Sequence, residues 1–294
     1  MKALLTAILL AFNLVSNAQD VEGLLDRVQA YKSSDTLYYF NSDGVDVKCV
    51  LVHGEFTAEN IASTFKKLHL KAKKLKPDPQ LGRPNFCEPG ELLQAPNVYS
   101  TIDYYFVGEN NVLYAFTFTS THEVSREFER TLINLFLDHK IPDEVYQPTD
   151  LKHANFPGYE LDLSGECSWG ECHWLSPTDF KGRYTHIRWS SFETKEKAEL
   201  DKVHHLHYIE IEGNLITHKE EVQLQFEGQP VSAIKVNILS GLVNSSSQVR
   251  RPLIAYIIVA TVKESFVTCV IIYGLSKTVS EKDVPEIAAQ IMKL

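Results

Sequence analysis

The short gaps between strand-like runs in the second half of the chain constrain its fold more than any other feature. Apolar and polar residues alternate over residues 185–190, 222–227 and 234–238, as in strands that bury one face. Brief turn sequences separate successive runs: Gly213-Asn214, Gly228-Gln229 and Lys263-Glu264-Ser265. A parallel sheet needs long crossover connections, whereas antiparallel neighbours are joined by tight turns. The spacing therefore predicts an antiparallel meander.

Two further segments belong to this half. The apolar, β-branched run Leu253–Ala260 is too short to span a membrane and predicts a buried strand. Near the end of the chain, Ser280 or Asp283 can cap a helix with an inward apolar stripe over residues 287–294. We expect that closing helix to cover the sheet.

The first half contains two hairpin patterns. Strand-like residues 36–40 and 45–52 flank Asn41-Ser42-Asp43-Gly44, whose residues tolerate the positive φ angles of tight turns. Residues 99–107 and 112–119 flank a second polar turn of the same kind. Each pattern predicts two antiparallel strands.

Helical patterns alternate with these hairpins. Apolar residues at steps of three or four predict a short helix over Val21–Tyr31, a second over Thr57–Leu75 and a third over His122–His139. The Pro- and Gly-containing segment Pro77–Pro96 predicts a long loop, which in compact domains is often functional.

A boundary is predicted near residue 150, because residues 141–158 contain three prolines and few periodic apolar positions. We expect an α+β protein of antiparallel sheets with helices packed on one face of each sheet. After a signal peptide over residues 1–19, an N-terminal α+β lobe would occupy residues 20–150. A C-terminal antiparallel-sheet lobe with a terminal helix would occupy residues 151–294.

The first nineteen residues, MKALLTAILLAFNLVSNAQ, have the pattern of a secretory signal peptide. Lys2 supplies a positive start, an apolar run follows, and Ser16-Asn17-Ala18 offers small residues for cleavage. The alternative is an N-terminal membrane anchor, although the apolar run is shorter than the roughly 18 residues of a membrane-spanning helix. We expect a secreted or periplasmic protein in an oxidising compartment.

Composition and motifs narrow the classes of function. The formal net charge is -9, so the chain lacks the basic character with which proteins neutralise nucleic-acid phosphates. No apolar run after the leader is long enough to predict a membrane span in the mature chain. The hydrolase elbow G-x-S-x-G, the zinc motif H-E-x-x-H and the Gly-rich nucleotide motifs do not occur in the sequence. We expect no cofactor, and whether the protein is an enzyme stays open.

The densest group of reactive side chains is GECSWGECHW, residues 165–174. Cys167 and Cys172 are close enough in sequence to form a disulfide after export. The alternative is a metal site in which Cys167, Cys172 and His173 are ligands. The disulfide is the favoured prediction, because the spacing does not follow the usual ligand patterns.

A histidine-rich segment could contribute to the same metal site. His204-His205-Leu206-His207 is predicted to lie on a strand, where His205 and His207 share one face. The alternative is a half-buried strand whose histidines are hydrogen-bonded or solvated.

A lysine-rich segment, KKLHLKAKKLK over residues 66–76, predicts a basic outer face on the second helix. Such a face can bind an anionic membrane surface or an acidic partner. More often it is simply solvated.

The function that we favour from the sequence is non-catalytic binding of a ligand, or of an envelope or extracellular protein. The proposed contacts are the Pro77–Pro96 loop and the aromatic residues Tyr104, Tyr105, Trp169 and Trp174, since aromatic rings often anchor interfaces. Burial of these rings in a core is the alternative. The competing class is a metal-binding protein or hydrolase that uses the cysteine and histidine cluster.

Overall fold

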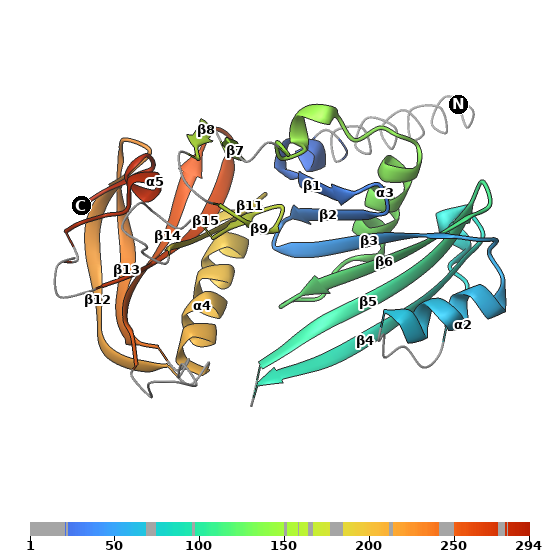
Figure 1. The fold of residues 1–294 in the computed structure, drawn as a ribbon, viewed down its shortest axis with the longest axis horizontal. Coiled ribbons are helices and arrows are strands. Elements are labelled where there is room, and N and C mark those ends of the chain that lie inside the picture. The colour runs from blue at the N-terminus through green and yellow to red at the C-terminus, as the bar shows by residue number, and fades with distance from the viewer. Residues whose placement is uncertain are drawn as a thin grey trace, which may run out of the picture.

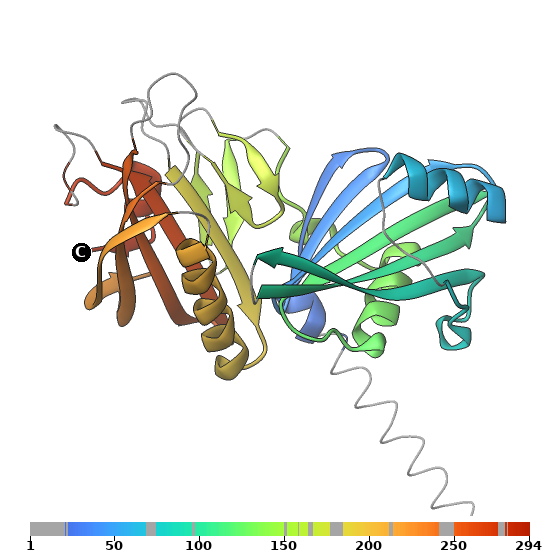
Figure 2. The same ribbon diagram turned by 90° about the horizontal axis from the view of Figure 1, so that it is seen from below.

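The computed structural model describes most of the chain after the leader. The described residues are 21, 23–68, 75–95, 98–149, 152–157, 159–163, 167–176, 185–211, 214–240, 250–275, 280 and 282–294. Two large antiparallel sheets, each formed by a different half of the chain, lie side by side in Figures 1 and 2. The protein therefore has the α+β character predicted from its sequence.

The first sheet has six strands in the order β1-β2-β3-β6-β5-β4. Its strands are β1 (Gln29–Ser34), β2 (Leu37–Ser42), β3 (Val45–His53), β4 (Asn85–Ala95), β5 (Val98–Glu109) and β6 (Val112–Ser120). Both predicted hairpins form, with two-residue turns whose residues all have positive φ: Asp43 and Gly44 in the first, Asn110 and Asn111 in the second.

Helices cover both faces of this sheet rather than one. Helix α3 (Arg126–Leu137) packs Leu132 and Ile133 with the strand residues Phe116 and Phe118. Helix α2 (Ala58–Lys67) packs Ile61 on the opposite face, with neighbouring positions of the same strands. Successive strand residues face opposite ways, so the apolar run over residues 104–107 supplies both cores.

The second sheet has eight strands in the order β16-β12-β13-β14-β15-β11-β10-β9. Its strands are β9 (Trp169–Glu171), β10 (Trp174–Leu175), β11 (Thr185–Phe192), β12 (Leu215–Phe226), β13 (Gln229–Leu239), β14 (Pro252–Val262), β15 (Ser265–Gly274) and β16 (Met292–Lys293). Consecutive strands from β12 to β15 pair antiparallel, which confirms the predicted meander.

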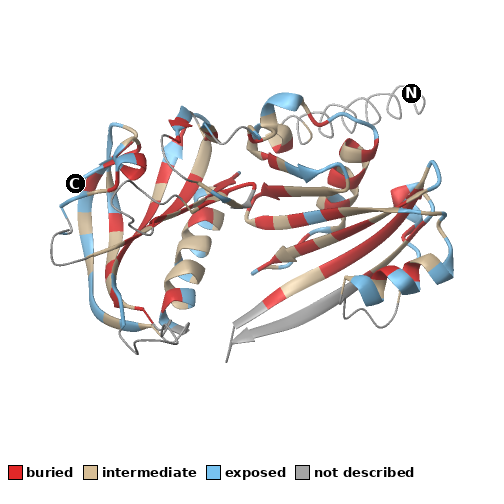
Figure 3. Cartoon of the chain, in the orientation of Figure 1, coloured by how far each residue is buried: buried red, intermediate tan, exposed pale blue. Residues whose placement is uncertain are grey.

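Both faces of the second sheet are also covered. Helix α4 (Lys195–Ile211) packs Ile209 against Val236, Ile257 and Val270. The opposite face packs on α5 (Glu286–Ala289) and on a small sheet of β7 (His153–Phe156) and β8 (Tyr159–Asp162). The described residues also form two short 3-10 helices, η1 (Pro79–Leu81) and η2 (Asp143–Val145). Figure 3 shows the buried residues concentrated on the central strands.

The prediction of a strand over His204–His207 is wrong, because these residues lie within α4. Its sequence KEKAELDKVHHLHYIEI is rich in residues of high helix propensity, and the Thr194 hydroxyl accepts a hydrogen bond from the Lys197 amide at 3.3 Å, as in a helix cap. The buried positions Ala198 and Ile209 follow a helical spacing. Helical spacing, and not alternation, was the correct pattern for this segment.

Three other segments also differ from prediction. Most of the supposed Pro77–Pro96 loop is strand β4, which pairs with β5 along almost its whole length. The closing helix is only one turn, α5, after which β16 pairs with β12 at Phe226 and Met292. The first helix ends at residue 27, because β1 begins at Gln29 and pairs with β2.

The predicted basic face of the second helix is described only in part. Lys66 and Lys67 lie in the last turn of α2, and Lys71 and Lys74 fall outside the described residues. Among the described residues, no helix combines the length and apolar character needed to cross a bilayer.

Candidate functional site

Two hairpins of the second sheet separate from each other, and a groove lies between them. Strands β13 and β14 pair from Leu239 and Pro252 to Ala233 and Ile258, and there their pairing ends. Each strand continues beyond that point with its other neighbour, β13 with β12 and β14 with β15. Residues 229–232 and 259–262, all of which the structure describes, therefore face each other without pairing.

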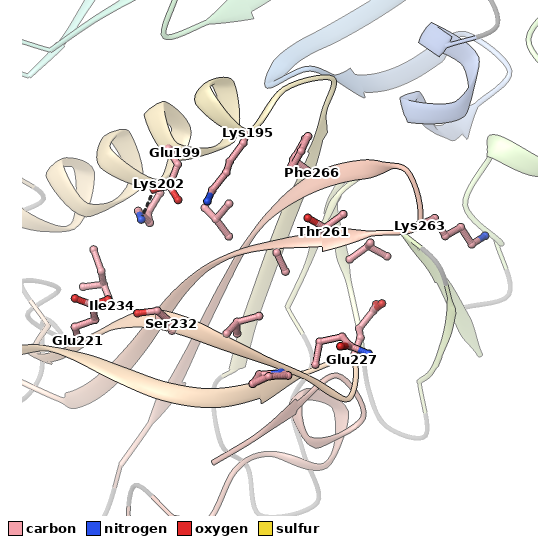
Figure 4. Close-up of a pocket in the computed structure, with 17 residues that line it drawn as sticks. Lys195, Glu199, Lys202, Glu221, Glu227, Ser232, Ile234, Thr261, Lys263 and Phe266 are labelled. Atoms are coloured by element: carbon pink, nitrogen blue, oxygen red, sulfur yellow. Dashed lines mark hydrogen bonds and ion pairs between the residues drawn. The ribbon is translucent and has the colours of Figure 1, made fainter.

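The space between these segments is a cavity of about 880 Å³. Its walls come from both hairpins and from the first two turns of α4, as Figure 4 shows. Among the described residues that line the cavity, polar and apolar residues occur in nearly equal number, and none is a histidine or cysteine. The polar and charged residues are Lys195, Glu199, Lys202, Glu221, Glu227, Gln229, Ser232, Thr261 and Lys263. The apolar residues are Pro230, Val231, Ala233, Ile234, Val259, Ala260, Val262 and Phe266.

The backbone itself is the main polar feature of this groove. In an antiparallel ladder, alternate residues direct both their N–H and C=O groups to the same neighbouring strand. Where β13 and β14 separate, such groups of both strands are directed into the groove. Pro230 lacks an N–H group, which limits the donors on the β13 side. The groove thus presents two incomplete strand edges.

Charged side chains lie on opposite sides of the groove. On the α4 side, Lys195 is exposed and Lys202 pairs with Glu199. On the β12–β13 side, Ser232 donates a hydrogen bond to Glu221. At the turn, Glu227 has one carboxylate oxygen, Oε1, that is buried and has no hydrogen-bond partner.

Glu227 is the least satisfied of these groups. Burial raises the pKa of its carboxyl group, and the nearby Lys263 opposes that shift. A buried carboxylate oxygen without a hydrogen-bond donor raises the free energy of the folded protein. A ligand that donates an N–H or ammonium group to this oxygen would remove that penalty. The groove can therefore bind a donor at this end and an acceptor near Lys195.

The predicted disulfide between Cys167 and Cys172 is wrong, since no disulfide joins any of the five cysteines, all of which are described. Strand β9 lies between the two residues, and an extended strand advances about 3.3 Å per residue, which separates their sulfur atoms. Cys172 is instead buried, with its sulfur 3.6 Å from Nδ1 of His173.

The three predicted metal-binding histidines do not all come together, although His205 is near enough to His173 for its charge to act on it. His173 is buried where the two sheets meet, with Nε2 3.3 Å from Oδ1 of Asp46. His205 lies 3.4 Å from Asp201 on α4. His207 lies 3.7 Å from Glu210. It points away from His205, because residues two positions apart lie on nearly opposite sides of a helix. Among the described residues, no group of three or more His, Cys, Asp or Glu side chains has the geometry of a metal site.

The predicted aromatic contacts are mostly internal. Tyr105 is fully buried and Tyr104 is 6% exposed on the other face of the first sheet. The ring of Trp169 lies 5.7 Å from that of Tyr31, and the ring of Trp174 lies 4.7 Å from His186. The alternative of burial therefore holds for the two tyrosines, and the two tryptophans are partly buried.

Sequence reasoning did not identify the groove. The sequence shows the turn at Gly228-Gln229. It does not show where the pairing of β13 with β14 ends, and that point determines where the two hairpins separate. In the sequence, Glu227 and Gly228 signal only the tight turn at one end of the groove. In that turn Glu227 has a positive φ of 49°.

Comparisons with known proteins do not assign this chain to a family. No protein-family profile matches the sequence, and no curated protein sequence matches it. Among solved structures, it is similar to the di-domain ARO/CYC StfQ from the steffimycin biosynthetic pathway, at 9% identity and a TM-score of 0.16, over 91% of this chain and 81% of that one. A likeness at this TM-score carries no argument about fold or function.

Proposed function

We propose that this chain is an exported binding protein that holds an extended polypeptide segment of a partner in the groove between β13 and β14. The observation that carries the proposal is the pair of strand segments, residues 229–232 and 259–262, that face each other across a cavity without pairing. An added strand gains main-chain hydrogen bonds from a sheet edge and gains specificity from alternate side chains. Open strand edges otherwise invite aggregation, which supports a natural occupant.

The charges around the groove favour a peptide over a uniformly charged ligand. A peptide carries donors and acceptors along its length, and its side chains or termini can carry both signs of charge. Lys195 would pair with a carboxylate of the partner, and Glu227 would accept a hydrogen bond from an N–H or ammonium group.

Export is part of this proposal and is supported by the leader pattern of Met1–Gln19, which lies outside the described residues. The partner would then be an extracellular or cell-envelope protein. We also propose that the two sheets belong to separate lobes, divided near residue 150, because each sheet takes its strands from one half of the chain.

The competing role as a metal-binding protein or hydrolase has no specific support among the described residues. Cys167 lies before β9, Cys172 and His173 lie in the turn after it, and His205 and His207 lie on two sides of α4. We therefore propose only the binding role.

A selection from random ten-residue peptides, displayed on phage and presented to the mature chain, tests the proposal. We expect enriched peptides to bind as strands and to slow amide hydrogen exchange at the groove-facing amides of Ser232, Val259 and Thr261, which are unpaired and exchange fast in the free protein. Thr261→Trp fills the groove at an exposed position and should weaken binding at least tenfold, or about 1.4 kcal/mol.

The matched control is Thr217→Trp, at another exposed threonine, which lies on β12 and does not line the groove. It should leave peptide affinity unchanged. Binding that is insensitive to Thr261→Trp, or protection confined to other strands, would overturn the proposal, as would a selection that enriches no peptide.

A further inference from the structure

A second cavity, of about 470 Å³, lies in the first half of the protein and is independent of the groove. It is bounded by the C-terminal part of α3 and by β2, β3 and β6, which lie together in Figure 1. Its volume falls within the roughly 300 to 1,000 Å³ that is typical of small-molecule sites. Four aromatic side chains dominate its wall: Tyr38, Tyr114, Phe136 and Tyr146.

The aromatic wall is held in place by ring-to-ring contacts. Phe136 meets Tyr38 edge to face at 5.0 Å between ring centroids, and it meets Tyr114 in the same manner at 6.1 Å. Phe40 lies behind them, 5.5 Å from Phe136 and 6.3 Å from Tyr146. Edge-to-face packing fixes ring orientation, so the cavity is formed before any ligand arrives.

Besides the hydroxyl groups of its three tyrosines, the cavity is lined by five polar side chains, those of Lys32, His139, Asp143, Gln147 and Thr149. Lys32 places its ammonium group 5.7 Å from the centroid of the Tyr38 ring. Its ion-pair partner, Asp35, is 95% exposed, and a pair that exposed is weak. Lys32 can therefore exchange Asp35 for an anion inside the opening at little cost.

The lining also carries a negative charge away from the Tyr38 ring contact of Lys32. Asp143 is exposed and lies near Tyr146, and His139 is an exposed residue of the same lining. A ligand with a single anionic group would consequently place that group at Lys32 and keep its apolar part against the rings.

We infer that this cavity is a binding site for a small, flat aromatic molecule that carries one carboxylate or other anionic group. The rings of Tyr38, Tyr114 and Phe136 would contact the aromatic part of the ligand, and Lys32 would pair with the anion. Tyrosine hydroxyl groups on the wall would orient any further polar atom of the ligand.

Two probes of the same shape test this inference: naphthoate, which has a carboxylate, and naphthalene methanol, which is neutral. Isothermal titration of the full mature chain should show one site for each, with naphthoate bound more tightly. Lys32→Met should weaken naphthoate binding roughly five- to tenfold and leave naphthalene methanol unchanged, since only the charge pair is removed.

Lys48→Met is the matched control, because Lys48 is exposed on the opposite face of β3 and the variant loses the same charge. It should not change either affinity. Leu51→Trp, which fills the cavity from β3, should abolish binding of both probes, and near-ultraviolet circular dichroism reports whether it stays folded.

Three outcomes would overturn the inference: no saturable binding of either probe, equal loss of naphthoate affinity in Lys32→Met and Lys48→Met, or unaltered binding in a folded Leu51→Trp variant. None of them bears on the peptide groove, because the two cavities share no lining residue.

Discussion

The most unusual single residue is Glu129, a glutamate with no exposed surface on the inner side of α3. Arg126 pairs with it at 2.8 Å and also approaches Asp103 at 3.6 Å. Burial and the neighbouring Asp103 carboxyl raise the pKa of Glu129 to about 8 in spite of Arg126. The folded protein therefore favours a protonated Glu129, whereas an unfolded chain ionises it at lower pH.

Replacement of Glu129 by Gln should make the protein more stable in mild alkali. The folded-state pKa is raised, so Glu129 costs stability progressively as pH rises from about 4.5 to about 8. At about pH 8, thermal unfolding of Glu129→Gln should occur several degrees higher than in the parent chain. Glu127→Gln, on the exposed side of the same helix, should show no such gain, and an equal gain in both variants would contradict the explanation.

At the scale of elements, α3 shows how far local sequence can define a structure. The apolar spacing predicted a helix over His122–His139, and α3 occupies the middle of that range. Its start is set by Ser125, whose hydroxyl accepts a hydrogen bond from the Phe128 amide at 3.1 Å. Helix α4 was missed because its histidines resembled an alternating strand, although Thr194 can cap its start and its buried residues Ala198 and Ile209 follow a helical spacing.

The cap at Ser125 gives a direct test at this scale. Ser125→Ala should cost about 1 kcal/mol of unfolding free energy, since the Phe128 amide loses its acceptor. Urea unfolding monitored by circular dichroism measures the change. Ser125→Asn restores an acceptor and should recover most of the loss, and a cost for Asn as large as that for Ala would rule out the capping role.

At the scale of the whole molecule, polar groups join the two sheets. The β2–β3 turn docks on β11, with the Asp43 amide donating to the Ser191 carbonyl at 2.9 Å. Arg188 pairs with Asp46 at 3.0 Å. His173 is packed beside this pair, and its burial lowers its pKa to about 4, against the opposing effect of Asp46. The contact between the sheets thus contains a histidine that is neutral when folded.

Mild acid should weaken this junction. An unfolded histidine binds its proton near pH 6.5, whereas folded His173 does so only near 4. Above about pH 6.5, His173 is neutral in both states and does not lower the free energy of unfolding. Between about pH 6.5 and 4, protonation of the unfolded chain lowers that free energy by up to about 1.4 kcal/mol per pH unit. His173→Gln should flatten the loss of unfolding free energy between about pH 6.5 and 5.

Urea unfolding at a series of pH values measures that slope. His53→Gln, at an exposed histidine of β3, should leave the slope as it is in the parent chain. An unchanged slope in His173→Gln would show that other groups cause the acid sensitivity.

The sequence alone determined much of the antiparallel character. Period-two alternation predicted β12 and β13, and the apolar run Leu253–Ala260 predicted β14. Short turns predicted their antiparallel pairing and both hairpins of the first sheet, because these features depend on residues close together in the chain. Local sequence did not predict strands β4 and β16. Each of these strands is stabilised by a neighbouring strand, β5 or β12, and that partner cannot be read from the segment itself.

Only the tertiary structure decided where the candidate sites lie. The groove exists because β13 and β14 stop pairing before their other partners do, and the aromatic cavity exists because α3 rests on three strands. Such distances arise from packing between distant segments, and local periodicity carries no information about them.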